Sequence, residues 1–103
     1  MVTMPKIKIY GPTYRNLHSE SFKVRYKALK GISTRYVNNP KVRKIILEKT
    51  NGYCSECGSN KYIQIDHIVS IYRYALNKGD YRELNSYENL QPLCRSCNAK
   101  KMP

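Results

Sequence analysis

The apolar positions near the middle of the chain predict a helix from about Pro40 to Thr50. The apolar residues that repeat there at helical spacing, and so mark one buried face, are Val42, Ile45 and Ile46. Asn39 before Pro40 is a typical helix start, because asparagine can cap the first turn and proline fits the first helical position. Gly52 is placed to end the helix.

Beyond this helix the pattern changes to the alternation that is typical of strands. Residues 62–65 alternate as a half-buried strand, and residues 90–93 predict a second strand. Between the two, residues 70–78 predict a short helix or an ordered loop. Residues 94–101 predict a tight turn between two cysteines that runs into a short C-terminal helix.

The first 39 residues have only weak helical periodicity, confined to residues 19–29. They contain eight basic side chains, a single acid and five interleaved aromatic residues. Two interpretations stay open: an arm that lies along a phosphate backbone and stacks on bases, or a partly disordered tail whose tyrosines cover the neighbouring domain. We expect a basic, tyrosine-rich arm over residues 1–39 and one domain over residues 40–103.

Charge points to the class of partner. Nineteen Lys and Arg residues against seven Asp and Glu give a formal net charge of +12 in 103 residues. A polyanion binds such a chain through counterion release, so nucleic acid is the leading partner. Charge alone separates neither DNA from RNA nor a nuclease from a passive binding protein.

The small size raises the question of what stabilises the fold. A core of this size commonly yields only about 3 to 5 kcal/mol of net stability. A structural zinc ion can contribute roughly 10 to 16 kcal/mol of coupled binding and folding free energy. The four cysteines are therefore the expected anchor of the fold.

The cysteines form two Cys-x-x-Cys pairs, Cys54 with Cys57 and Cys94 with Cys97. The start of the chain has no continuous apolar run of signal-peptide length and no stretch reaches transmembrane length, so we expect a cytoplasmic protein with no membrane partner. In a reducing compartment such pairs predict a closed, tetrahedral zinc site rather than disulfides. A thioredoxin-like redox role is disfavoured because it needs one exposed pair beside a βαβ pattern.

The residues between the two pairs carry the candidate chemistry. The gap between Cys57 and Cys94 exceeds the roughly 15 to 20 residues of a simple zinc ribbon, so a functional segment is inserted there. It contains Asp66 and His67 directly after the first predicted strand. A histidine with an ordinary pKa near 6.5 can take a proton from water at cellular pH.

Three segments taken together resemble the HNH endonuclease family. They are Ile65-Asp66-His67-Ile68-Val69, Tyr87-Glu88-Asn89-Leu90-Gln91-Pro92-Leu93-Cys94 and Cys97-Asn98-Ala99-Lys100-Lys101. Each segment alone is a weak signal, but their order and their frame of zinc-type cysteines make the match specific. The resemblance spans roughly residues 53–101, about half of the chain.

The resemblance implies an α+β fold with a ββα-metal core, in which two antiparallel strands and a helix grip one divalent ion. It implies that His67 is the general base, that Asp66 is a metal ligand and that Asn89 orders the hairpin loop. Asn98 matches the third motif position, which is often histidine, so the chain resembles an HNN variant similar to the HNH domain of the CRISPR effector nuclease. Oxygen ligands from Asp66 and Asn98 favour Mg²⁺ or Mn²⁺ at this second site.

The implied activity is hydrolysis of phosphodiester bonds in DNA, leaving 5′ phosphate and 3′ hydroxyl ends. Compact members of the family are frequent in bacteriophage genomes beside packaging genes. This implies a phage protein acting in the host cytoplasm, with packaging proteins such as terminase as partners, either as a monomer or as a weak dimer. The alternative is a zinc-braced nucleic-acid-binding module without catalysis, which has no use for Asp66 and His67.

A geometric condition accompanies the catalytic assignment. Side chains alternate along a regular strand, so Asp66 and His67 point to opposite faces. Both can act on one phosphate only if the strand bends or ends there. The simpler interpretation is a core or surface histidine with Asp66 as its hydrogen-bond partner, and Asn89 and Asn98 are then a turn residue and an exposed helix residue.

Overall fold

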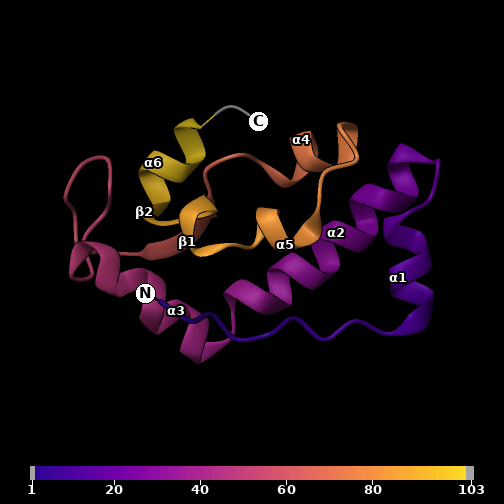
Figure 1. The fold of residues 1–103 in the computed structure, drawn as a ribbon. Coiled ribbons are helices and arrows are strands. Elements are labelled where there is room, and N and C mark those ends of the chain that lie inside the picture. The colour runs from indigo at the N-terminus through magenta and orange to yellow at the C-terminus, as the bar shows by residue number, and fades with distance from the viewer. Residues whose placement is uncertain (1, 102–103) are drawn as a thin grey trace.

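The computed structural model describes residues 2–101 and combines six helices with one two-stranded sheet in that range. The helices are α1 (Gly11–Leu17), α2 (Phe22–Val37), α3 (Pro40–Leu47), α4 (Ile71–Leu76), α5 (Tyr81–Leu84) and α6 (Arg95–Lys100). Short 3-10 turns η1 (Glu48–Thr50) and η2 (Tyr87–Asn89) precede the strands β1 (Ile63–His67) and β2 (Leu90–Cys94), respectively. Helix α2 runs along one long side of the molecule, and α4 and α5 lie over it (Figure 1). The hairpin with α6 lies at the end of the molecule away from α1.

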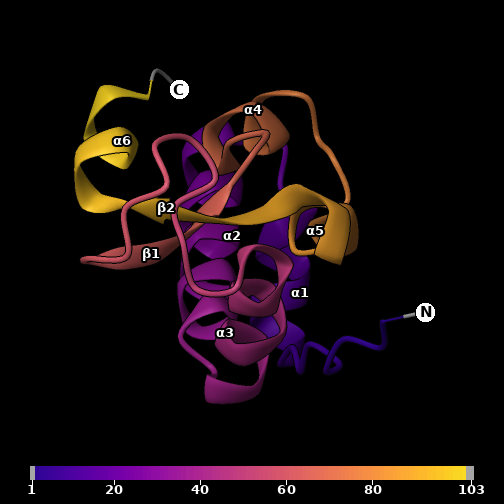
Figure 2. The same cartoon turned by 90° about the vertical axis from the view of Figure 1, so that its left-hand side faces the viewer.

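The predicted ββα arrangement is confirmed. β1 and β2 pair antiparallel, with Ile63 opposite Cys94 at one end and His67 opposite Leu90 at the other. α6 follows β2 directly and packs on the hairpin, as the turned view also shows (Figure 2). The fold is therefore α+β, and the helix expected from about Pro40 to Thr50 is present as α3 continued by η1.

The N-terminal segment is more helical than its periodicity indicates. α2 runs over 16 residues and α1 over seven, whereas the hydropathy pattern indicates only weak helical periodicity over residues 19–29. The buried residues of α2 have helical spacing, and they are Arg25, Leu29, Ile32, Ser33 and Tyr36. Two of these five, Arg25 and Ser33, are polar. These polar residues hide the apolar stripe, which is why the sequence pattern missed most of the helix. The division of the chain at residue 39 stays a prediction.

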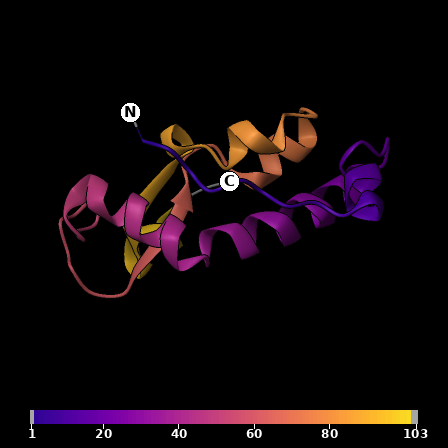
Figure 3. The ribbon, with the colours of Figure 1, turned by 60° about the horizontal axis from the view of Figure 1, so that its bottom comes forward.

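The interior consists of three neighbouring clusters. The first joins α1, α2, α4 and α5 through Leu17, Leu29, Ile32, Ala75 and Leu84. The second joins α2, α3 and β2 through Tyr36, Val42, Ile46 and Leu90. The third is small and lies at the cysteines, with Leu93 as its one buried residue that is not a cysteine. Figure 3 shows the resulting layers, with α2 beneath α4 and α5 and the hairpin beside α3.

Within residues 2–101, no helix is both long enough and apolar enough to cross a bilayer.

Candidate active site

The four cysteines converge at the end of the hairpin where Ile63 pairs with Cys94, which we call the outer end. The Sγ atoms of Cys54, Cys57, Cys94 and Cys97 all lie within 4.8 Å of one another, and none is in a disulfide. Tetrahedral zinc with Zn–S bonds of about 2.3 Å places its sulfurs about 3.8 Å apart. The Sγ atoms of Cys57 and Cys94 are 3.6 Å apart, so the cluster fits a structural zinc ion.

Backbone geometry builds the two turns that carry these thiols. Gly58 has a φ of +77°, a left-handed conformation that follows the first cysteine pair and favours glycine. The backbone amides of Glu56 and Cys97 each lie 3.4 Å from a cysteine sulfur, on Cys54 and Cys94 respectively. Such N–H···S contacts orient a thiolate toward a shared ion.

The pKa values of the Cys54 and Cys97 thiols are shifted in opposite directions. Burial opposes ionisation of Cys54, but backbone hydrogen bonds from Cys57, Cys94 and Glu56 lower the pKa of its thiol to about 6. Side-chain hydrogen bonds from Cys94 and Cys57 raise the pKa of Cys97 to about 12. Four thiolates therefore cannot coexist here at neutral pH without positive charge between them, which a bound metal supplies.

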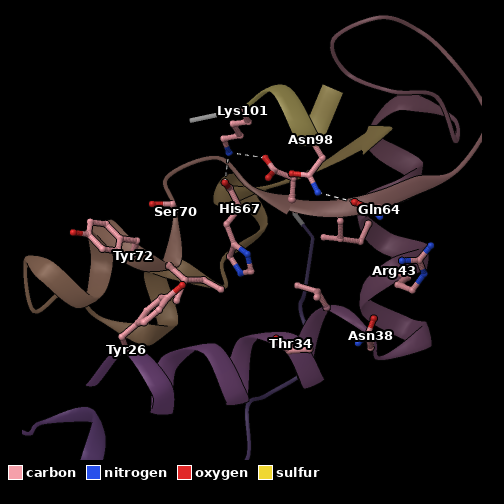
Figure 4. A pocket seen from close by; sticks show the side chains of 14 residues that line it. Tyr26, Thr34, Asn38, Arg43, Gln64, His67, Ser70, Tyr72, Asn98 and Lys101 are labelled. Atoms are coloured by element: carbon pink, nitrogen blue, oxygen red, sulfur yellow. Dashed lines mark hydrogen bonds and ion pairs between the residues drawn. The ribbon is translucent and has the colours of Figure 1, made fainter. Parts of the chain in front are cut away.

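A cavity of about 580 Å³ lies at the opposite end of the hairpin, where His67 pairs with Leu90, which we call the inner end. Asp66, His67 and Asn98 line it, together with Tyr26 and Thr34 from α2, so both halves of the chain form its walls. Figure 4 shows the His67 ring extending from the strand toward α2, while Lys101 and Asn98 lie on the α6 side. The alternation of Asp66 and His67 is retained, but β1 ends at His67 and both side chains reach the same cavity.

Asp66 is nearly buried and faces the C-terminal helix. Its Oδ2 accepts hydrogen bonds from Lys101 Nζ at 2.7 Å and from Gln91 Nε2 at 3.0 Å. Lys101 Nζ also donates to the backbone carbonyl of His67. Two oxygens therefore converge on one cationic group at the cavity wall, which shows that this position suits positive charge.

His67 has a different partner from the one considered at first. Its Nε2 lies 2.8 Å from Asn85 Oδ1, and Asp66 is not its hydrogen-bond partner. The residue is only 9% exposed, and burial lowers the pKa of the imidazole below its usual value of 6.5, although Asn85 and Asp66 act in the opposite direction. The ring is consequently neutral at pH 7, the form that a general base requires.

The two motif asparagines have distinct surroundings. Asn89 is buried and connects the segment after β1 with the end of α5: its Oδ1 accepts from the Val69 amide at 2.9 Å, and its Nδ2 donates to the carbonyls of Val69 and Leu84 at 3.1 and 2.8 Å. Asn98 lies on α6 with its Nδ2 2.6 Å from Gln64 Oε1. Its amide nitrogen is thus engaged, which leaves its amide oxygen as the group that can bind a cation.

Several residues at the site carry no signal in the sequence. Asn85 and Gln64 contact the motif residues His67 and Asn98 but belong to no recognisable spacing pattern. Ser33, which lies in the N-terminal segment, accepts a hydrogen bond from Asn85 Nδ2 at 3.0 Å. Only the tertiary structure brings these side chains to the hairpin.

Comparison with known proteins agrees with this geometry. A family model described as HNH endonuclease matches residues 54–103, which include both cysteine pairs and the whole hairpin. No curated protein and no solved structure gave a significant match.

Proposed function

We propose, because residues 54–103 match the HNH endonuclease family model, that this protein is a divalent-metal-dependent endonuclease that hydrolyses phosphodiester bonds in DNA. The observation that carries the proposal is the cavity at the end of the hairpin. Asp66, His67 and Asn98 come from three positions of the motif, and all three line this one space. A binding module without catalysis has no need for a carboxylate and a neutral imidazole at the same cavity.

In the proposed reaction His67 is the general base. It takes a proton from a water molecule, whose oxygen attacks the phosphorus of the scissile linkage. The bond between phosphorus and the 3′ oxygen breaks, which gives a 5′ phosphate and, after the leaving oxygen gains a proton, a 3′ hydroxyl. General-base catalysis of this kind contributes about 10²- to 10⁴-fold to a rate.

Asp66 and Asn98 are the proposed holders of Mg²⁺ or Mn²⁺. Both offer oxygen ligands, which these hard cations prefer, and Asp66 already faces a cationic group, the Lys101 ammonium. The ion, when bound, stabilises negative charge on the phosphate and on the leaving oxygen. Lys101 and Gln91 both contact Oδ2 of Asp66, so an ion would bind at Oδ1 or would take the place of the Lys101 ammonium at Oδ2.

The proposed substrate and setting follow from charge and family. The net charge of +12 draws the protein to DNA, and Arg43 at the cavity wall can contact a phosphate next to the scissile one. We further propose that the protein is phage-encoded, acts in the host cytoplasm and works with packaging proteins such as terminase. Reduced cysteines are in keeping with that compartment.

A plasmid-nicking assay with Mg²⁺ or Mn²⁺ tests the proposal. The two histidines of the chain give a matched pair of variants, since His67 lines the cavity and His18 does not. We expect His67→Ala to retain zinc and helical circular dichroism but to lose activity by about 10²- to 10⁴-fold. His18→Ala should cleave like the wild type.

Two results would contradict the proposal. Equal cleavage by His67→Ala and the wild type would remove the imidazole from the reaction. No cleavage by the zinc-loaded wild type, on single- or double-stranded DNA across several divalent ions, would favour the non-catalytic binding module.

A further inference from the structure

Three buried side chains from distant parts of the sequence form a chain that ends on His67. Asn85 Oδ1 lies 2.8 Å from His67 Nε2, and Asn85 Nδ2 lies 3.0 Å from Ser33 Oγ. Asn85 is 2% exposed and Ser33 is fully buried. Ser33 belongs to α2, whereas Asn85 directly follows α5, so the link crosses from the N-terminal segment to the hairpin.

The neighbours of Asn85 determine which way its amide faces. Its Nδ2 lies 3.1 Å from the backbone carbonyl of Tyr81, and a carbonyl oxygen only accepts hydrogen bonds. With the amide turned round, two oxygens would face each other at that distance in a buried place. The Nδ2 group therefore faces Tyr81 and Ser33, and the Oδ1 atom faces His67.

This orientation determines which imidazole nitrogen carries the proton. Because Asn85 Oδ1 is an acceptor, the neutral ring donates to it from Nε2–H. The lone pair is then on Nδ1. Among the described residues, every buried side-chain nitrogen or oxygen has a hydrogen-bond partner. The Nδ1 atom of His67 has no such partner in that range, so it is not fully buried and is open to the cavity that His67 lines.

We propose that Asn85, oriented by Ser33 and the Tyr81 carbonyl, is a positioning residue that holds His67 in the Nε2–H tautomer with the Nδ1 lone pair directed into the cavity. The effect of Asn85 on catalysis rests on the proposed function. The tautomer of His67 does not depend on that function. The assignment also gives α2 a place in the active site, because Ser33 is one of the two groups that orient the amide.

The test is ¹⁵N NMR of the histidine rings in the full-length, zinc-loaded protein, at a pH about two units above the ordinary histidine pKa of 6.5. Comparison with His67→Ala separates the signals of His67 from those of His18. We expect a protonated Nε2 with slow hydrogen exchange and an unprotonated Nδ1 for His67. A wild-type ring protonated on Nδ1 would overturn the proposal without any variant.

Variants of Asn85 then separate positioning from a merely structural role. Asn85→Leu removes the acceptor, so slow exchange at Nε2 should be lost and kcat should fall about 10- to 100-fold while KM changes less than about twofold, as for partners that orient a catalytic side chain. Asn85→Asp keeps an oxygen toward Nε2 and should retain the tautomer, but its second oxygen faces the Tyr81 carbonyl, so the variant should be less stable than the wild type. Ser33→Ala, a smaller change, should lower kcat only several-fold.

The outcomes distinguish this proposal from the proposed function. Retention of slow Nε2–H exchange and of wild-type kcat in Asn85→Leu would overturn the role of Asn85. An Nε2–H tautomer that depends on Asn85, in a wild type that cleaves no DNA, would support the positioning and contradict the nuclease assignment.

Discussion

The two ends of the hairpin are stabilised by different forces. At the outer end, where Ile63 pairs with Cys94, Leu93 is the one buried side chain of the local apolar cluster that is not a cysteine, within residues 2–101, and the four thiols face one another. At the inner end, where His67 pairs with Leu90, Leu90 packs in an apolar cluster with residues of α2 and α3, and Asn85 links His67 to Ser33 of α2.

This difference separates folding from chemistry. The outer end depends on a ligand, since four cysteine sulfurs gathered with little apolar packing around them fit a bound zinc ion, whose binding is coupled to folding. The inner end depends on packing and hydrogen bonds, so the position of His67 should respond to changes in helices far from the metal. Variants at each end should therefore fail in different measurable ways.

The largest expected effect is at the outer end. Cys94→Ser removes a zinc ligand that also belongs to β2, and we expect loss of both zinc and the folded state, because structural zinc contributes roughly 10 to 16 kcal/mol to coupled folding. Zinc content and thermal circular dichroism measure the result. The exposed neighbour variant Ser96→Ala should bind one zinc and melt like the wild type. A folded Cys94→Ser protein would show that packing alone holds the hairpin.

The next effect concerns the inner end. Leu84 is fully buried in the cluster of α2, α4 and α5 and directly precedes Asn85, so Leu84→Ala should lower the free energy of unfolding by about 2 to 5 kcal/mol. Zinc should remain bound in the folded protein, unlike in Cys94→Ser. Urea unfolding with zinc present measures this, with the exposed Leu76→Ala as the control. Loss of zinc from folded Leu84→Ala would show that the two ends are not independent.

The sequence predicted the outer end better than the inner end for a physical reason. The spacing of the two Cys-x-x-Cys pairs predicts the zinc site, the alternation of residues predicts the two strands, and the resemblance of the motif segments implies the ββα arrangement. The motif residues are likewise local to this hairpin. Their shared cavity, however, depends on where β1 ends, which the alternation of Asp66 and His67 did not determine.

The inner end could not be predicted because its support is tertiary. The buried face of α2 contains Arg25 and Ser33 among its apolar residues, so a pattern of hydropathy shows a solvated segment where a packed helix lies. Those two polar residues have long-range partners, the Ala75 carbonyl and Asn85. Arg25 and Ser33 thus weaken the helical hydropathy pattern of α2, and the same two residues connect α2 to other parts of the molecule.

A smaller effect is expected from Arg25. Its guanidinium is buried and donates to the carbonyls of Ala75, Ser19 and Glu20, at distances between 2.7 and 3.0 Å. Arg25→Met leaves these acceptors without their donor, so the free energy of unfolding should fall by about 2 to 3 kcal/mol. Arg35→Met, an exposed change on the same helix, should have little effect in the same urea titration. Equal stability of the two variants would mean that water replaces the guanidinium.

The smallest effect is expected at Asp80, the N-cap of α5, the short helix that precedes Asn85. Its Oδ1 accepts from the Arg82 amide at 2.7 Å, and its Oδ2 lies 2.8 Å from the Arg82 guanidinium. Asp80→Ala should cost about 1 kcal/mol, a typical value for a lost cap. Asp80→Asn keeps a capping oxygen and loses only an exposed ion pair, so at neutral pH its stability should be near that of the wild type.

Acid pH separates the cap from the charge at Asp80. Hydrogen bonds from Arg82 lower the pKa of this carboxyl below its usual value of 3.8. A lowered pKa means that the carboxylate stabilises the fold above the unfolded-state pKa and that this contribution is lost as pH falls through the folded-state pKa. The difference in unfolding free energy between the wild type and Asp80→Asn should therefore shrink below about pH 4. A difference that stays constant down to pH 2 would show that the charge of Asp80 has no part in holding α5 beside Asn85.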